Sequence, residues 1–566
     1  MIHTLVVLCL WSILLQTPDA KQPPHPSVDY DVAQKHEIKP HRRTIPLQGV
    51  HAGFNQLHLT LTVSPTGDVL DAEATGESET LNFWPQLQDE VRRWKFIPFE
   101  ESGKAITAEV EEYIDLVPPE RLPTVHVAPP IIRQDSKVAI TLSRSGCFGS
   151  CPSYTVTVST DNIVFDGDGY VVAPGKHTDR VDALEVRKLA KRFVSADFYS
   201  MDDSYTASVT DNPSYSLSIA IDNRTKKVHD YVGEWEGMPA IITELEDAVD
   251  AFARTERWIS GGDGLVEDLQ AEKFDFHTFQ AQVMLKEAAS RGAAETVRGL
   301  LEAGVSLEPL PTPKPKERYM AVPFEEVGWL NAASSHPEAL QVLLDAGASK
   351  DDQADKDLAL VGAARSGNVE SVRTLIAYGA NPNADLRERI VTESGGGITI
   401  QGKGAGSVLI YAAESGNPEM VREILRYHPK LEMRGRRGQT ALFTAGDYRS
   451  SDKEGARVEC VRLLVQAGAD VNARDDNGNT PLHEIFLTDV EEELLKLGAD
   501  VNARNDDGET PIFTTVDDAA IPLFIHRGAD LTIRNNKGET VMEAAKAKGP
   551  QRQEALRKAV QELAQP

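Results

Sequence analysis

The chain has 566 residues, of which 41% are hydrophobic and 26% charged, enough for several domains with separate cores. Its formal net charge of −28 gives a surface that repels phosphate backbones and anionic lipid. The composition therefore argues against nucleic acid as a partner and leaves one or more proteins as the expected partners.

The N-terminus has the pattern of a secretory signal. Leu5 to Leu15 is an apolar run too short to cross a bilayer, which needs about 20 residues. Ala20 is a small residue at the expected cleavage point, so we expect residues 1–20 to be removed. The mature protein is then exported, periplasmic or secreted, with no stable membrane span. Residues 21–45 are rich in proline and predict an extended arm.

Residues 46–118 predict one small α+β domain. Apolar and polar residues alternate from His58 to Val63, a turn follows, and a second strand begins at Val69. Leu81 to Trp94 has the spacing of a helix with one buried face, and Ala108 to Leu116 predicts a last strand.

This order of elements and four short motifs resemble the C-terminal domain of TonB-family energy transducers. The motifs are Val63-Ser64-Pro65-Thr66-Gly67-Asp68-Val69, Val91-Arg92-Arg93-Trp94, Phe96-x-Pro98 and Gly103. The resemblance implies the fold and, as one alternative, a role in envelope energy transduction. TonB itself keeps a membrane anchor and a long spacer, whereas the apolar segment and the arm are short in this chain.

Residues 131–259 predict a second α+β domain. Strands are indicated by alternating apolar and polar residues, and helices by a spacing of three and four. The strands are expected at Val138–Leu142, Tyr154–Ser159, Ile163–Phe165, Ser214–Ile221 and Lys227–Tyr231, and the helices at Ala183–Phe193 and Pro239–Arg254.

Cys147 and Cys151 lie close together in this domain. Zinc needs four ligands, and no further Cys or His lies near them in the sequence. Because an exported compartment favours disulfides, we interpret them as a structural disulfide, with redox and metal-binding roles as alternatives. Cys460 remains and is expected to be a buried thiol.

Two motifs of the same domain resemble an uncharacterised bacterial family. One is Cys147-x-Gly149-x-Cys151-Pro152-x-Tyr154, and the other is Thr210-Asp211-Asn212-Pro213; the closing Trp258 fits as well. This resemblance implies a domain boundary but no activity.

From Phe276 to the end, the sequence repeats itself. Paired alanines end a first helix at Ala288-Ala289, Ala363-Ala364 and Ala412-Ala413 and allow close helix packing. A second, Leu- and Val-rich helix follows and stops at glycine, which adopts the left-handed cap without steric cost. These glycines are Gly304, Gly347, Gly379, Gly468, Gly498 and Gly528.

The tetrapeptide Thr480-Pro481-Leu482-His483 resembles the T-P-L-H signature of ankyrin repeats. Pro481 suits the first helical position, where its missing N–H has no partner to lose, and His483 is expected to cap the helix. The resemblance implies an all-α solenoid over residues 276–566 with a surface for protein partners. The expected fold class is therefore two small α+β domains followed by an ankyrin-repeat solenoid.

The array of about eight repeats is irregular. The spacing from Gly468 to Gly498 and from Gly498 to Gly528 is 30 residues, below the usual ~33, which predicts short helices in these repeats. Insertions are expected near residues 306–325, 384–404 and 446–456.

Weak candidates for chemistry lie in or near the insertions. Gly397 to Lys403 fits a phosphate-binding loop, but Gly404 replaces the required Ser or Thr, and we interpret the run as a glycine-rich hairpin. Tyr319, Phe324 and Trp329 are binding anchors or, more simply, packing residues. We assign no catalytic, cofactor-binding or metal-binding residue.

The leading hypothesis is an exported, non-enzymatic scaffold that binds a protein partner through its repeats. The alternatives are an enzyme with its site in residues 131–259, whose repeats recruit substrate, and the TonB-like component described above.

Overall fold

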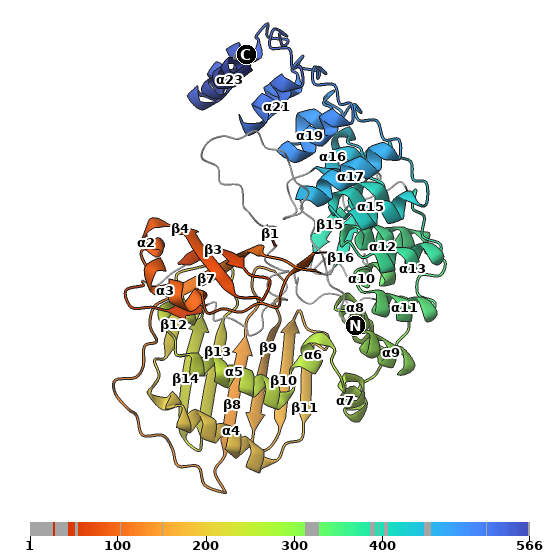
Figure 1. Ribbon diagram of the computed structural model, residues 1–566. Coiled ribbons are helices and arrows are strands. Elements are labelled where there is room, and N and C mark those ends of the chain that lie inside the picture. Colours follow the sequence, from red (N-terminus) through yellow and green to blue (C-terminus); the bar gives the residue numbers. More distant parts are fainter. Residues whose placement is uncertain are drawn as a thin grey trace. The chain divides into compact units, whose positions relative to one another are not determined.

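The computed structural model forms two compact units, Met1–Gly262 and Asp263–Pro566 (Figure 1). Two sheet-rich domains precede a helical repeat array, which confirms the predicted fold class. The structure describes residues 27–28, 44–50, 55–101, 104–149, 151–311, 328–384, 391–394, 397–400, 406–446, 454–516 and 518–563. Several predictions lie outside these residues: the signal over 1–20, Gly103, Tyr319, Phe324, and most of the arm and the three insertions.

The first domain is a five-stranded sheet with the order β1-β7-β3-β4, in which β2 also pairs with β7. The strands β3 and β4 form an antiparallel hairpin, and β3 also pairs antiparallel with β7. Every second residue of β3 is buried, which forms the core against helix α3. The elements are β1 Ser27–Val28, β2 Thr44–Pro46, β3 Gln56–Val63, β4 Val69–Gly76, α2 Ser78–Leu81, α3 Trp84–Val91, β5 Glu100–Glu101, β6 Lys104–Ala105 and β7 Ala108–Val117.

One expectation for this domain differs from the structure. The helix predicted over Leu81–Trp94 is broken into α2 and α3, because Pro85 lacks an N–H and, in a continuous helix, its ring would clash with the carbonyl of Leu81, four residues earlier. In the arm predicted over residues 21–45, β1 and the start of β2 are extended and pair in parallel with β7.

The second domain is a seven-stranded sheet with the order β11-β10-β9-β8-β13-β14-β12. Figure 1 shows α4 and α5 across one face of this sheet, and both helices contact β8 and β9. The elements are β8 Val138–Arg144, β9 Ser153–Ser159, β10 Ile163–Gly169, β11 Gly175–Asp179, α4 Ala183–Ser195, β12 Ser204–Thr206, β13 Tyr215–Ile221, β14 Arg224–Tyr231, α5 Ala240–Ala253 and α6 Glu256–Ser260. Strands β11 and β12 were not predicted, because their residues are mostly polar and show no alternation.

The second unit begins with α7, Leu265–Ala271, and continues as eight described helix pairs that follow one another from α8 to α23 (Figure 1). The paired alanines of the first helices are buried, as close helix packing requires. The pairs are α8 Phe279–Ser290 with α9 Ala294–Glu302, α10 Trp329–Ala332 with α11 Pro337–Asp345, α12 Gln353–Arg365 with α13 Val369–Ala377, α14 Val408–Glu414 with α15 Pro418–Leu425, α16 Ala441–Ala445 with α17 Glu454–Gln466, α18 Pro481–Glu484 with α19 Thr488–Lys496, α20 Pro511–Thr514 with α21 Ile521–His526, and α22 Val541–Lys548 with α23 Pro550–Leu563.

The repeats with the 30-residue spacing have short first helices, and their turns bond in register. The helices α18 and α20 have 4 residues each, compared with 13 in α12. Asn472 Nδ2 donates to the Gly498 carbonyl, and Asn502 makes the same bond to Gly528. Arg474 donates to a backbone carbonyl 30 residues further on, as Arg504 does in the next repeat. One set of bonds is thus repeated along the end of the array.

Ion pairs link the second helices of successive repeats. Arg373 of α13 pairs with Glu423 of α15 (2.8 Å), and Arg462 of α17 pairs with Glu493 of α19 (2.9 Å). Between them, Arg422 of α15 pairs with Glu459 of α17 at 3.3 Å. Because each pair joins two repeats, the ladder adds contacts between neighbours along the outer side of the helices.

Candidate functional site

The ankyrin-like tetrapeptide builds the frame of the array. Thr480, Pro481, Leu482 and His483 are all buried, and Pro481 begins helix α18. The glycines at the ends of the second helices have positive φ, as the predicted caps require: 104° at Gly468, 101° at Gly498 and 92° at Gly528. The tetrapeptide is therefore part of the core of the array, whereas the three glycines cap their helices at exposed positions.

His483 joins two repeats through its imidazole. Its Nδ1 accepts the backbone N–H of Thr480 (3.1 Å), so the ring proton is on Nε2, which donates to the carbonyl of Glu509 (3.1 Å). Burial lowers the pKa of His483, which keeps the ring neutral.

We predict that His483→Ala lowers the free energy of unfolding of the array by about 2 kcal/mol, because two buried hydrogen bonds are lost. Its folded pKa is below the ordinary value of 6.5, so the stabilisation is present above pH 6.5 and is lost as the pH falls. Urea unfolding from pH 5 to pH 8 tests this, with His526→Ala at an exposed site as control. Equal pH profiles in the wild type and His483→Ala would contradict the prediction.

The loops that join the second helix of one repeat to the first helix of the next are here called fingers. In the last repeats, the finger tips are exposed and do not repeat in sequence. The residue just before each tip is here called the frame residue; Asp475 and Asn535 are two of them, and both are buried. The two residues after it form the tip, and their charge differs from finger to finger. The exposed tip pairs are Arg436 and Arg437, Asp476 and Asn477, Asp506 and Asp507, and Asn536 and Lys537. The tips are therefore the exposed part of these fingers that does not repeat in sequence.

The insertion around residue 395 contains the hairpin expected from its glycines. Strand β15, Val391–Ser394, pairs antiparallel with β16, Gly397–Ile400. The backbone of β16 lies near α10 and α12, so the insertion approaches the first helices of two earlier repeats. Residues 401–403 of the phosphate-loop pattern lie outside the described part.

Trp329 is a packing residue in the structure. Its indole N–H donates to the carbonyl of Leu307 (2.9 Å), and the ring is 9% exposed. Lys286 Nζ lies 4.9 Å from the ring centroid, and burial lowers the pKa of this lysine to about 8.

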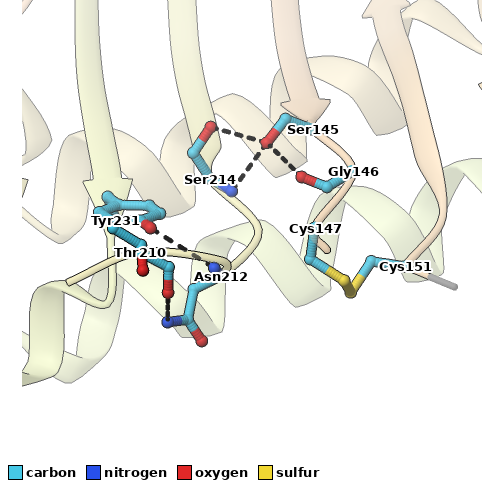
Figure 2. The surroundings of a disulfide bond; sticks show 8 residues. All are labelled: Ser145, Gly146, Cys147, Cys151, Thr210, Asn212, Ser214 and Tyr231. Atoms are coloured by element: carbon cyan, nitrogen blue, oxygen red, sulfur yellow. Dashed lines mark hydrogen bonds between the residues drawn. A yellow bond between two sulfur atoms is a disulfide. The ribbon is translucent and has the colours of Figure 1, made fainter. Parts of the chain in front are cut away.

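In the middle domain, Cys147 and Cys151 form a disulfide across the loop between β8 and β9 (Figure 2). The bond closes a loop whose tip presents Phe148, with 90% of its surface exposed. Cys460 is buried in the array, and burial raises the pKa of its thiol to about 12. The described residues contain no group of three or more His, Cys, Asp or Glu side chains placed to hold a metal ion.

The two motifs of this domain, distant in sequence, lie at the same end of the sheet (Figure 2). Ser145, just before the disulfide loop, accepts the backbone N–H of Ser214 with its Oγ at 2.9 Å. Asn212 of the second motif donates its backbone N–H to the hydroxyl of Tyr231 (3.4 Å). The pairing of β8 with β13 brings both loops to the same end of the sheet.

Next to these loops, the end of β8, the start of β9 and helix α5 form a polar cluster. Asp250 accepts from the guanidinium of Arg144 (2.6 Å) and from the hydroxyl of Tyr154 (2.7 Å). Burial raises the pKa of Tyr154, so its hydroxyl stays protonated. Burial alone would lower the pKa of Arg144, but the neighbouring charge of Asp250 helps to raise it above its ordinary value.

Glu246 is the most unusual member of this cluster. It lies on the buried side of α5, is 3% exposed, and its Oε1 has no hydrogen-bond partner among the described residues. Burial, and then the charge of Asp230, raise the pKa of Glu246 to about 8. Burial also raises the pKa of Asp230. The sequence did not indicate Glu246, which looks like an ordinary charge on an amphipathic helix.

We predict that Cys147→Ser with Cys151→Ser lowers the free energy of unfolding of the middle domain by about 2 kcal/mol, because the disulfide closes only a short loop. Hydrogen exchange of peptides from residues 138–253 localises the effect, and the wild type under dithiothreitol is the control. A domain that fails to fold without the bond would show that it does more than close the loop.

Comparison with known families identifies two parts of the chain. A sequence model described as ankyrin repeats in three copies matches residues 409–487, and a single-repeat model matches residues 357–385 and 477–506. The C-terminal unit contains ankyrin repeats. These ankyrin repeats indicate protein–protein interaction and imply protein partners. The middle domain matches, over residues 138–253, a family described as Domain of unknown function (DUF6438).

The similar proteins cover little of this chain. Diacylglycerol kinase iota of Rattus norvegicus is 41% identical over 92 residues, and those of Mus musculus and Homo sapiens are 40% identical over 92 residues. The match spans 16% of this chain and 8% of each kinase.

Among solved structures, the Bd0816 predatory endopeptidase of Bdellovibrio bacteriovorus in complex with immunity protein Bd3460 is similar, at 26% identity. The match covers 35% of this chain and 96% of that chain, with a TM-score of 0.28, too low to support any inference. Within the described residues, no helix combines the length and the apolar composition needed to cross a membrane.

Proposed function

We propose that this protein is an exported, non-enzymatic scaffold that holds a protein partner on its ankyrin array. The observation that carries the proposal is that each finger combines a buried or half-buried frame position with an exposed tip whose charge varies from repeat to repeat. A constant frame with variable tips is what a binding surface needs, because specificity then changes without loss of the fold.

The test is affinity capture from the exported fraction with the full chain. Wild type is compared with Asp506→Lys/Asp507→Lys and with Arg436→Glu/Arg437→Glu, which reverse tip charges. The control is Glu554→Lys, an exposed charge on the terminal helix α23. We expect one protein to be captured reproducibly by wild type and control and at least about tenfold less by one tip variant. The scaffold proposal would be wrong if no protein is captured, or if the wild type, the two tip variants and the control capture it equally.

Export is a separate part of the proposal. It is supported by the apolar run before Ala20 and by the Cys147–Cys151 disulfide, since disulfides persist in oxidising compartments. Intact mass of the protein from its own cells tests it: loss of residues 1–20 is expected. A full-length mass would favour the TonB-like alternative, which needs a retained anchor.

The N-terminal domain would add a second contact. We propose that it is TonB-like and that a partner strand pairs with an edge of its sheet. What supports this is the position of β4 at one end of the described strand order. A proline at Ala74 of β4 would block such pairing, and unchanged partner binding would argue against the second contact.

A second candidate function is an activity of the middle domain, with the repeats recruiting its substrate. Glu246 favours it, because a carboxyl with a pKa of about 8 is protonated at neutral pH and suits a general acid. Mass spectrometry of the captured partner after incubation with wild type and with Glu246→Gln is the test. A modification made by wild type alone would establish the activity. A partner left unmodified by both wild type and Glu246→Gln would argue against the activity and favour the scaffold function.

A further inference from the structure

A cavity lined by charged residues lies on the second helices of two neighbouring repeats. It has a volume of about 230 Å³ and is lined by Arg373 of α13 and by residues that run from the first turn of α15 to its C-cap. The complete lining is Arg373, Glu419, Arg422, Glu423 and Arg426. Three guanidinium groups face two carboxylates, so the lining is cationic although the chain as a whole is strongly anionic.

Glu423 holds two of these arginines in place. It is 4% exposed, and its Oε2 accepts from Arg373 Nη2 and from Arg426 Nη1, both at 2.8 Å. Its Oε1 accepts from the hydroxyl of Tyr427 at 3.3 Å. The hydrogen bond from Arg373 is the main cause of a lowered pKa at Glu423. One ionised carboxylate therefore positions two cations and neutralises only one of them.

Among the residues that the structure describes, each of these arginines uses one nitrogen in a hydrogen bond to a carboxylate. A guanidinium has five N–H donors, and Arg373 and Arg426 each use one nitrogen on Glu423. Arg422 uses one nitrogen on Glu459. The side chains are 50% exposed at Arg373 and Arg422 and 62% at Arg426. Arg373 and Arg426 are held by one carboxylate, and their remaining N–H groups are open to the cavity. Such an arrangement suits a ligand with several oxygen acceptors.

We propose that this cavity binds an anionic group with two or more oxygen acceptors, a carboxylate or a phosphate. The group is either an acidic side chain of the protein held by the repeats, which rests on the proposed function, or a free anion. It lies on the second helices, apart from the finger tips, so it adds a contact that tip variants leave intact.

Isothermal titration calorimetry of the full chain tests the proposal with two probes, inorganic phosphate and hexaglutamate. We expect wild type to bind at least one probe, more weakly at high salt, and Arg373→Gln/Arg426→Gln to bind it at least about tenfold more weakly. The control is Arg298→Gln, the equivalent position in α9, whose ion pair in the described part of the chain is with Glu295 of its own helix (3.6 Å). If the double variant does not fold, Arg422→Gln replaces it.

The outcomes separate the two sources. Binding of phosphate alone identifies a free anion, and binding of hexaglutamate identifies the acidic side chain of a partner. No binding of either probe, or equal binding by wild type and variants, overturns the site. Since neither probe depends on the natural partner, the site can fail while partner capture succeeds, and the reverse.

Discussion

Asp355→Ala is expected to lower the free energy of unfolding of the ankyrin array by about 3–5 kcal/mol. Asp355 lies on α12 but caps α10 of the preceding repeat, accepting the backbone N–H groups of Leu330 (2.9 Å) and Asn331 (3.1 Å). Ser349 Oγ donates to the same carboxylate. The side chain is 3% exposed, so water cannot replace it, and alanine leaves these donors buried without an acceptor.

Urea unfolding measures this loss, and hydrogen exchange at Leu330 and Asn331 localises it. Asp352→Ala is the matched control, because Asp352 caps only its own helix, from an exposed position, and should cost about 1 kcal/mol. Gly328→Ala offers a second variant, since an added Cβ would meet Asp355 Oδ1 at 1.8 Å. If Gly328→Ala costs as much in the Asp355→Ala background as in wild type, the proposed coupling between the two residues is wrong.

Glu246→Gln is expected to stabilise the middle domain at pH 8 by roughly 3 kcal/mol. The pKa of Glu246 is about 8 in the folded state against an ordinary value of 4.5. Between these two values the unfolded chain has lost a proton that the folded chain still holds. Folding stability from this group is therefore greatest below pH 4.5 and falls until about pH 8. Glutamine removes that penalty because it does not ionise.

The measurement is urea unfolding of wild type and Glu246→Gln from pH 5 to pH 8.5, followed by exchange in residues 138–253. The two proteins should differ little near pH 5 and increasingly towards pH 8. Glu244→Gln on the exposed side of α5 is the control and should leave the profile unchanged. A wild-type profile as flat as that of Glu246→Gln would mean that the carboxyl is not buried as described.

A residue whose removal stabilises the fold is one that evolution keeps for another reason or has not yet lost. The sequence could not reveal Glu246, because the fold alone decides which charge on a helix meets the sheet. Likewise, the two motif loops meet through the pairing of β8 with β13, whose partners are about 70 to 80 residues apart in sequence. Local sequence patterns do not predict such long-range contacts. They also do not predict the cap that Asp355 provides for Leu330, 25 residues earlier in the chain.

Local patterns, in contrast, predicted much of the architecture. The alternation in β3 and the glycines after the second helices report bonds made within a few residues, so their positions hold in the structure. Predictions failed where a local signal was weak or competing: polar β11 and β12 were missed, and Pro85 overrode a helical pattern. The TonB-like domain and the exported location remain proposals.

The hydrogen bonds between the last fingers have a consequence for how this array can change in length. Asn472 and Asn502 make the same bond to the next repeat, and so do Arg474 and Arg504. Removing one 30-residue unit would therefore join a donor to an acceptor of the same kind, with no new interface to design. We therefore expect the array to stay folded when a whole unit is lost or gained in this region, so that its length changes in steps of one repeat.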